Sequence, residues 1–231
     1  MKPCKLMFSR EKDNAILAIS EETRIEMQLY ESAEIQFEKN EDTMLITRSV
    51  SGDQEAFAQI VKNHQRMVFN VAYRFLGSYE EAEELTQEVF LRVYRFLKSF
   101  EGKSSLRTWI YKITVNSALN RQQWLKRRKH YHQVSLDNPE PDTDMTLENK
   151  IPGTGGSPES AALNLELQEK IQGCLDKLPK RLRIAIILRD VEGLSYDEIS
   201  EALGINQGTV KSRIARARSA VKNALSGYIE E

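Results

Sequence analysis

Basic residues near the end of the chain have a spacing suited to binding a polyanion. Between Lys211 and Lys222 there are five basic residues and no acidic one. In a helix, four apolar residues of this segment share one narrow stripe: Val210, Ile214, Ala217 and Val221. The opposite side carries small residues, which let the backbone approach a groove, and cations, which can bind phosphates or guanine edges. The candidate DNA contacts are Thr209, Lys211, Ser212, Arg213, Arg216 and Arg218.

The preceding residues predict a short helix and a tight turn. Ser195 and Glu198 have the spacing of a capping box, which satisfies backbone N–H groups at a helix start. Gly204 suits a left-handed residue at the helix end, and Asn206 can cap the next helix. Residues 196–215 therefore have the layout of a helix-turn-helix, whose second helix lies in the DNA major groove.

The composition of the whole chain narrows the class of protein. The 231 residues have a net charge of −1, and 40% of them are hydrophobic, which is enough for one or two small domains. The longest apolar runs are too short to span a membrane, and the run from Ala15 to Ile19 is too short for a signal peptide. We therefore expect a cytoplasmic protein.

The sequence shows no catalytic or metal-binding pattern. Cys4 and Cys174 are far apart, so neither a disulfide framework nor a zinc site is predicted. His130 and His132 lie in a basic stretch without a neighbouring cysteine or carboxylate cluster, and are interpreted as surface residues. The adjacent acids at 80–84 are interpreted as a solvated helix start. We expect no catalytic residue, no metal and no cofactor.

Charge is distributed unevenly along the chain. The segments and their net charges are 1–42 (−4), 43–136 (+7), 137–161 (−5) and 162–231 (+1). The positive charge is concentrated in two stretches, 103–129 and 211–222. Two separated basic elements indicate two separate contacts with one polyanion.

Two helical domains are predicted on either side of an acidic linker. Residues 137–161 contain four of the six prolines and are expected to be flexible. Apolar residues at spacings of three and four predict helices in 43–136 and 162–231. The extension 1–42 is predicted to be disordered or to form a weak hairpin. The expected fold class is all-α, with two small helical domains joined by the linker.

Helix boundaries follow from breaks in this periodicity. In the N-terminal domain the first long helix ends at Gly77 and the second begins near Glu80. The third follows the loop Phe100–Ser105 and runs to about Arg128. Trp109 falls on the apolar stripe of the third helix with Leu106, which favours a core position over base stacking. Helices of the C-terminal domain are expected near 163–177, 180–190, 195–203 and 207–225.

With these elements in place, the chain resembles the extracytoplasmic-function group of bacterial RNA polymerase sigma factors. The segment LDKLPKRLRIAIILRDVEGLSYDEISEALGINQGTVKSRIARARSAVK resembles the family's region 4. The stretches EELTQEVFLRVY and SSLRTWIYKITVNSALN resemble parts of its region 2. The resemblance covers about 43–136 and 162–226. It implies a promoter-specificity subunit that binds core RNA polymerase, opens the −10 element and reads the −35 element.

The resemblance also implies roles for individual residues. The implied polymerase contacts are Glu84, Gln87, Glu88, Leu91 and Arg92. The implied contacts with the −10 element are Lys103, Ser104, Ser105, Arg107, Lys112, Asn116, Asn120, Arg121, Lys126, Arg127 and Arg128. Their chemistry fits such a role, because a glycine-serine loop and paired asparagines can hydrogen-bond a flipped base while cations hold phosphates.

The implied partners are the β′ clamp and β flap of the polymerase, promoter DNA and an anti-sigma factor, without membrane insertion. The chain itself is not expected to be an enzyme, because nucleotide addition belongs to the polymerase core. Members of the family usually begin near the residues numbered 40–45 here. The extension 1–42 is therefore either upstream of a translation start at Met44 or a regulatory arm that masks basic surfaces.

Two other interpretations stay open. The chain could be a helix-turn-helix transcriptional regulator in which 43–136 forms a sensor or dimerisation domain. That alternative predicts a homodimer and palindromic half-sites one DNA turn apart. In the other, the N-terminal domain is a helical adaptor for a partner and DNA contact is incidental. Co-purification with core polymerase separates the three interpretations.

Overall fold

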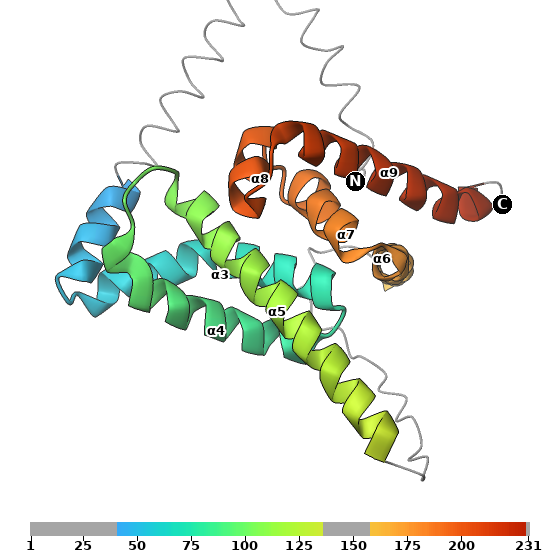
Figure 1. The fold of residues 1–231 in the computed structure, drawn as a ribbon, viewed down its shortest axis with the longest axis horizontal. Helices are drawn as coiled ribbons and strands as arrows, with labels where there is room; N and C mark the ends of the chain where they lie inside the picture. The colour runs from blue at the N-terminus through green and yellow to red at the C-terminus, as the bar shows by residue number, and fades with distance from the viewer. Residues whose placement is uncertain (1–40, 136–157, 230–231) are drawn as a thin grey trace, which may run out of the picture.

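The computed structural model describes residues 41–135 and 158–229, with side chains described over 41–128 and 168–225. The described parts contain helices and no strand (Figure 1). In chain order the elements are a helix over 41–50, α3 (Gln54–Leu76), α4 (Tyr79–Phe96), the 3-10 turn η2 (Leu97–Ser99), α5 (Leu106–Ser135), α6 (Pro158–Lys177), α7 (Lys180–Ile186), the π-helical segment η3 (Ile187–Val191), α8 (Tyr196–Leu203) and α9 (Gln207–Ile229). The predicted all-α fold class is confirmed.

The sequence predictions and the observed boundaries differ in a few places. The hairpin predicted within 1–42 lies outside the described residues, and so does most of the predicted linker. Helix α6 begins at Pro158, inside the stretch predicted as linker. Helix α5 continues to Ser135, past the predicted end near residue 128.

Helices α3, α4 and α5 pack against one another as a bundle. Asp53 caps α3 by accepting hydrogen bonds from two backbone N–H groups of its first turn. Gly77 ends α3 in the left-handed conformation, with φ of 76°, where a side chain would be strained. The Ser78 hydroxyl then caps α4. These short-range signals account for the sharp turn between the two helices.

The apolar faces of α4 and α5 form the core of this bundle. Leu85, Val89 and Val93 of α4 are fully buried, as is Ile110 of α5. Trp109 is partly buried and its ring centroid lies 5.3 Å from that of Phe100. The prediction that Trp109 packs in the core is therefore confirmed.

The helix predicted over 180–190 changes from α-helical to π-helical hydrogen bonding within its length. Helix α7 ends at Ile186, and a π-helical segment continues to Val191. Its wider turn is visible in the hydrogen bond from the Glu192 N–H to the Ile187 carbonyl, 3.1 Å long. Gly193, with φ of 76°, then turns the chain toward α8. No sequence pattern predicted the π turn, because the apolar spacing of these residues also fits an α-helix.

The helix-turn-helix forms as its local signals predicted. Both hydrogen bonds of the capping box between Ser195 and Glu198 are present at the start of α8. Gly204 lies in the left-handed conformation with φ of 62°. The Asn206 side chain accepts a hydrogen bond from the Thr209 N–H at 2.8 Å. Three members of the predicted α9 stripe are buried and the fourth is partly buried: Val210, Ile214, Ala217 and Val221.

We expect Ser195→Ala to lower the free energy of unfolding by about 1 kcal/mol, because the Glu198 N–H loses its capping acceptor. Chemical denaturation followed by circular dichroism measures the difference. Ser219→Ala is the control, since the exposed Ser219 hydroxyl only bonds the Ala215 carbonyl of its own helix. Equal effects of the two substitutions would contradict a capping role.

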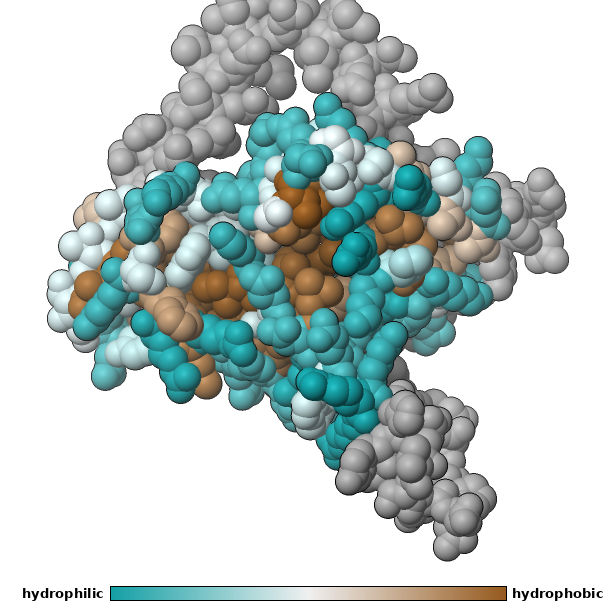
Figure 2. All heavy atoms as spheres, viewed as in Figure 1, coloured by the Kyte–Doolittle hydropathy of each residue, from teal (hydrophilic) through white to brown (hydrophobic). Residues whose placement is uncertain are grey.

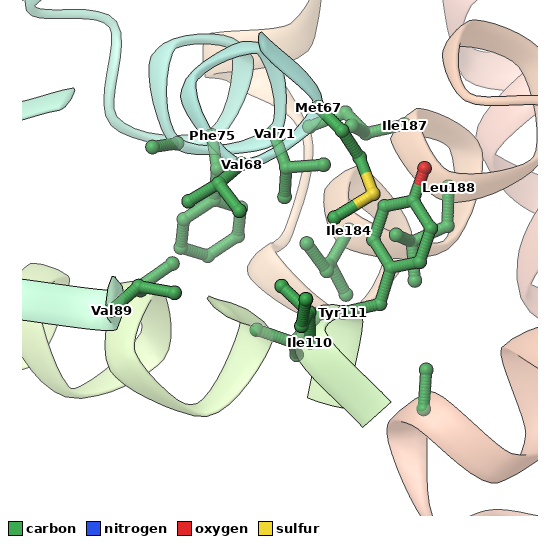
Figure 3. Close-up of a cluster of buried hydrophobic side chains, with 14 of the residues drawn as sticks. Met67, Val68, Val71, Phe75, Val89, Ile110, Tyr111, Ile184, Ile187 and Leu188 are labelled. Atoms are coloured by element: carbon green, nitrogen blue, oxygen red, sulfur yellow. The ribbon is translucent and has the colours of Figure 1, made fainter. Parts of the chain in front are cut away.

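The two helical halves share one continuous hydrophobic core. Figure 3 shows Met67 and Phe75 of α3 and Tyr111 of α5 packed with Ile184 and Leu188 of the C-terminal half. Tyr111, Phe75 and Ile184 rank among the largest fully buried side chains in the described residues. The sequence predicted two domains, and the structure adds that they pack directly against each other.

Candidate nucleic-acid interface

The outward face of α9 has the composition that DNA binding requires. Lys211, Ser212, Arg216 and Ser219 are exposed, and the apolar stripe on the other side holds the helix to α7 and α8. Ser212 and Ser219 are small, so they leave space for a closely approaching groove. Arg216 stands between them, with no described contact that would hold its guanidinium away from a ligand.

The cations on the two flanks of α9 are less available to a ligand than those on its outward face. Arg213 is partly buried, and burial together with nearby Arg181 lowers the pKa of its guanidinium. Arg218 donates two hydrogen bonds to Asp190, at 3.0 and 2.5 Å, and these raise its pKa. Arg218 was predicted as a DNA contact, but in this structure it ties α9 to the segment before α8.

The loop before α5 is compact and partly exposed. Gly102 has a positive φ of 68°, and Lys103 is exposed and paired with Glu101. The Ser105 hydroxyl accepts a hydrogen bond from the Thr108 N–H at 3.1 Å, so it caps α5. The hydroxyl of Ser105, one of the two serines predicted to contact DNA, is therefore already engaged in capping the helix.

Three predicted contacts lie on one exposed face of α5. Lys112, Asn116 and Asn120 follow at intervals of four residues and are all exposed. The two amides therefore lie one helical turn apart on the surface. The structure brings together the pair that the sequence assigned to base recognition.

Arg107 points toward the C-terminal half of the chain. Its Nη2 lies 3.3 Å from the Tyr111 hydroxyl and 3.4 Å from the Glu192 carbonyl oxygen. The Tyr111 hydroxyl donates to the Glu192 carboxylate at 2.9 Å. Burial raises the pKa of both Tyr111 and Glu192. Tyr111 is buried and Glu192 is partly buried, while Arg107 is exposed at the edge of the group.

Arg121 is bound to α4 and is not presented to solvent as predicted. Its Nε donates to the Glu81 carboxylate at 2.5 Å, and its Nη2 pairs with Glu84. The Arg121 side chain is only 19% exposed. Helical geometry turns residue 121 about 100° away from the face of Asn120, toward α4. The role of Arg121 as a −10 contact stays a prediction.

The end of α5 presents a cluster of cations around an aromatic ring. Lys126, Arg127 and Arg128 are exposed, and hydrophilic side chains gather over this part of α5 in Figure 2. Trp124 is 43% exposed and lies near two guanidinium groups, those of Arg121 at 5.5 Å and Arg128 at 5.3 Å. Beside it is an open cavity of about 290 Å³ lined by Glu88, Ser117, Asn120, Arg121, Trp124 and Arg127.

The implied polymerase contacts follow one side of α4. Gln87 and Leu91 are exposed, and Leu91 has 61% of its surface in solvent. Glu88 and Arg92 form an ion pair of 2.6 Å within this face. Tyr94 and Phe96, nearer the end of α4, are each 55% exposed. The sequence reasoning missed these two aromatics, because periodicity alone does not separate a buried from an exposed aromatic.

Two known family models match the chain. Residues 60–130 match the model of sigma-70 region 2, and residues 168–221 match that of sigma-70 region 4. The chain is 34% identical over 200 residues to the RNA polymerase sigma-H factor of Pseudomonas aeruginosa, covering 84% of this chain and 98% of the relative. It is 38% identical over 175 residues to the ECF RNA polymerase sigma factor SigW of Bacillus subtilis, covering 75% and 91%.

The chain belongs to the extracytoplasmic-function (ECF) group of sigma factors. The sigma factor directs transcription initiation. Its fold is similar to that of the sigma factor RpoE from Bartonella quintana, solved in complex with the anti-sigma factor NepR, with a TM-score of 0.53 and 26% identity over 74% of this chain and 96% of that chain. Over the described residues, the sigma factor has no helix long and apolar enough to cross a membrane.

The long-range contacts of the sigma factor were not predicted from its sequence. Arg183, 6% exposed, donates to the Phe75 carbonyl oxygen at 2.9 Å across the two halves. Glu192 and Tyr111 form the second polar contact between them. A charged residue at an apolar position, as Arg183 is between Leu182 and Ile184, is a signal that could have pointed to a buried cation.

Proposed function

We propose that the two helical halves divide promoter recognition between them. The C-terminal domain, residues 162–231, reads the −35 element with α9 and contacts the β flap. The N-terminal domain, 43–136, binds the β′ clamp and opens the −10 element. The segment predicted as a linker lies outside the described residues as far as residue 157, and so does the N-terminal extension as far as residue 40. The observation that carries the proposal is the exposed face of α9, where Arg216 stands between two small serines.

The −35 assignment is supported by the shape and charge of α9. A recognition helix must place short side chains at its closest approach and long cations beside them. Ser212 and Arg216 are one turn apart on the exposed face, and Lys211 and Thr209 flank them. Arg213 and Arg218 contribute if their present contacts exchange for DNA.

The −10 assignment is supported by the exposed face of α5. Asn116 and Asn120 can hydrogen-bond an unstacked base, and Lys112 lies on the same face to hold a phosphate. The cations Lys126, Arg127 and Arg128 extend this surface along the helix and fit the backbone of the adjoining duplex. The loop residues Lys103 and Ser104 complete the −10 surface at the other end, and Ser105 supports this loop by capping α5 and can contact DNA only beside that cap.

The polymerase contact is supported by the exposed apolar residues of α4. Leu91 places a large apolar side chain in solvent, as a partner-binding surface requires. Glu84, Gln87, Glu88 and Arg92 provide a polar rim around it. Because RpoE from Bartonella quintana was solved in complex with an anti-sigma factor, an anti-sigma factor is a further proposed partner. Catalysis remains with the core polymerase.

Reconstitution with core polymerase tests this function. The full chain is expected to form a stable complex with core polymerase and to support run-off transcription from a promoter that the core alone does not use. Leu91→Asp should abolish complex formation and run-off together, while Glu55→Gln, an exposed change on α3, should preserve both. A chain that never binds core polymerase would refute the proposal.

A salt titration tests the role of the α5 cations. Replacing Lys126 and Arg127 by alanine is expected to reduce the slope of log K against log salt by roughly 1–2 for promoter binding by the holoenzyme, because fewer counterions are released. Arg121→Gln is the matched control, since Arg121 is paired with Glu81 and Glu84 and should leave the slope unchanged. An unchanged slope in the double variant would show that these cations do not contact phosphates.

A further inference from the structure

The π-helical segment η3 holds two successive charged side chains against the helix-turn-helix. Asp190 accepts two hydrogen bonds from Arg218 of α9, and its side chain is only 14% exposed. Its neighbour Arg189 is partly buried and donates to the Leu194 carbonyl oxygen at 2.6 Å. Single π turns within helices often occur at functional positions. Both guanidinium groups are therefore fixed close to the start of α8.

The ring of Tyr196, the first residue of α8, lies among these cations. The Arg189 Cζ is 4.8 Å from the ring centroid, and the Lys211 Nζ of α9 is 5.7 Å from it. The pKa of Arg218 is raised chiefly by its hydrogen bonds to Asp190, and Tyr196 adds to this effect through space. Tyr196 is partly buried and packs against the hydrophobic core. The ring is thus a supported platform, and its face attracts cations at these distances.

The two cations over the ring differ in their freedom to bind a ligand. Arg189 is already engaged by the Leu194 carbonyl oxygen. Lys211 is exposed, and within the described parts of the chain it forms no ion pair. The nearby acid at the start of α8, Asp197, accepts a hydrogen bond from Gln207 instead. One cation therefore anchors the ring, and the ring holds another whose ammonium group is available.

Lys211 stands at the junction of the two helices of the helix-turn-helix. Helices α8 and α9 pack against each other there (Figure 1), and Lys211 directly precedes Ser212 of the outward face of α9. In this motif the first helix crosses the DNA backbone while the second lies in the major groove. A cation at the junction consequently lies where a phosphate passes, and it contributes affinity and orientation.

We propose that Tyr196 is a positioning residue of the −35 surface: anchored by Arg189, its ring holds Lys211 beside the outward face of α9, where the lysine binds a DNA phosphate. The inference rests on the proposed −35 role of α9. A lysine side chain loses rotamer freedom when it binds, and one already held against a ring loses less. Tyr196 thereby raises promoter affinity through Lys211.

Promoter binding by the holoenzyme, measured over a range of salt concentrations, tests the proposal. Lys211→Gln should weaken binding and reduce the slope of log K against log salt by about 1, because one phosphate contact is lost. Tyr196→Leu removes the ring but keeps an apolar side chain, and should weaken binding about two- to fivefold and lower the slope. Tyr196→Phe keeps the ring and should restore wild-type affinity.

Two further comparisons separate positioning from a merely structural role. Tyr196→pentafluorophenylalanine keeps the shape of the ring but withdraws electron density from its face, so it should weaken binding as Tyr196→Leu does. In the Lys211→Gln background, Tyr196→Leu should cost little further affinity, because the ring acts through the lysine. Lys177→Gln, which removes an exposed cation from α6, is the charge control and should leave the slope unchanged.

The opposite results would overturn the proposal. A loss of affinity in Tyr196→Phe would assign the role to the hydroxyl, and wild-type affinity in the fluorinated variant would exclude the ring face. An unchanged slope in Lys211→Gln would show that this lysine binds no phosphate. The proposed function has its own readout, because a wild-type holoenzyme that binds promoters with an intact and a scrambled −35 element equally would refute the −35 role itself.

Discussion

Replacing Arg183 by alanine is expected to lower the free energy of unfolding of the full chain by about 2–4 kcal/mol. Arg183 is 6% exposed and donates to the carbonyl oxygens of Phe75 and Asp176 and to the Asp176 carboxylate. Alanine leaves these acceptors without their charged donor. It also removes a guanidinium packed 5.8 Å from the Phe75 ring centroid.

Urea denaturation followed by circular dichroism measures this change. Arg181→Ala is the control, because Arg181 is exposed on the same helix and loses the same charge. The control should shift the free energy by less than about 0.5 kcal/mol. If Arg183→Ala were equally mild, the cation would not be holding the two halves together.

The second large effect is expected from Arg216→Ala. Loss of one bidentate contact with a base edge costs about 1–3 kcal/mol, which corresponds to roughly 5- to 150-fold in promoter affinity. Arg216 is exposed and central on α9, so its removal should not affect folding. Core polymerase binding should be unchanged, because the proposed clamp surface lies on α4.

Run-off transcription measures the effect on two promoters. One has an intact −35 element, and in the other that element is scrambled. Arg216→Ala should reduce transcription from the intact promoter toward the level of the scrambled one. Lys222→Ala, which removes an exposed cation from the same helix, should weaken both promoters slightly and equally. A loss of polymerase affinity in Arg216→Ala would show that α9 contacts the enzyme instead of DNA.

The features that the sequence predicted are those encoded over short distances. The caps at Ser195 and Asn206, the turn at Gly204 and the stripe of α9 each depend on residues within a few turns of one another. Such signals are set by backbone hydrogen bonding and helical periodicity, so they are readable without tertiary information. The same holds for the exposed pair Asn116 and Asn120.

The features that the sequence missed depend on contacts between distant segments. Tyr111 and Glu192 are 81 residues apart, and Arg183 and Phe75 are 108 apart. Arg121 looked like a free cation because its carboxylate partners lie on another helix whose position the local pattern does not fix. Charge and periodicity therefore identified the basic surfaces but not which of their cations are paired within the protein.

The central claim is that two basic surfaces of one sigma factor read two elements of one promoter. Mapping of transcript 5′ ends after overexpression of the chain tests this claim most directly. The induced transcripts are expected to share a bipartite motif centred near −10 and −35, and Arg216→Ala should remove the starts that depend on the −35 half. Induced starts without any common upstream motif, or no new starts at all, would contradict the account.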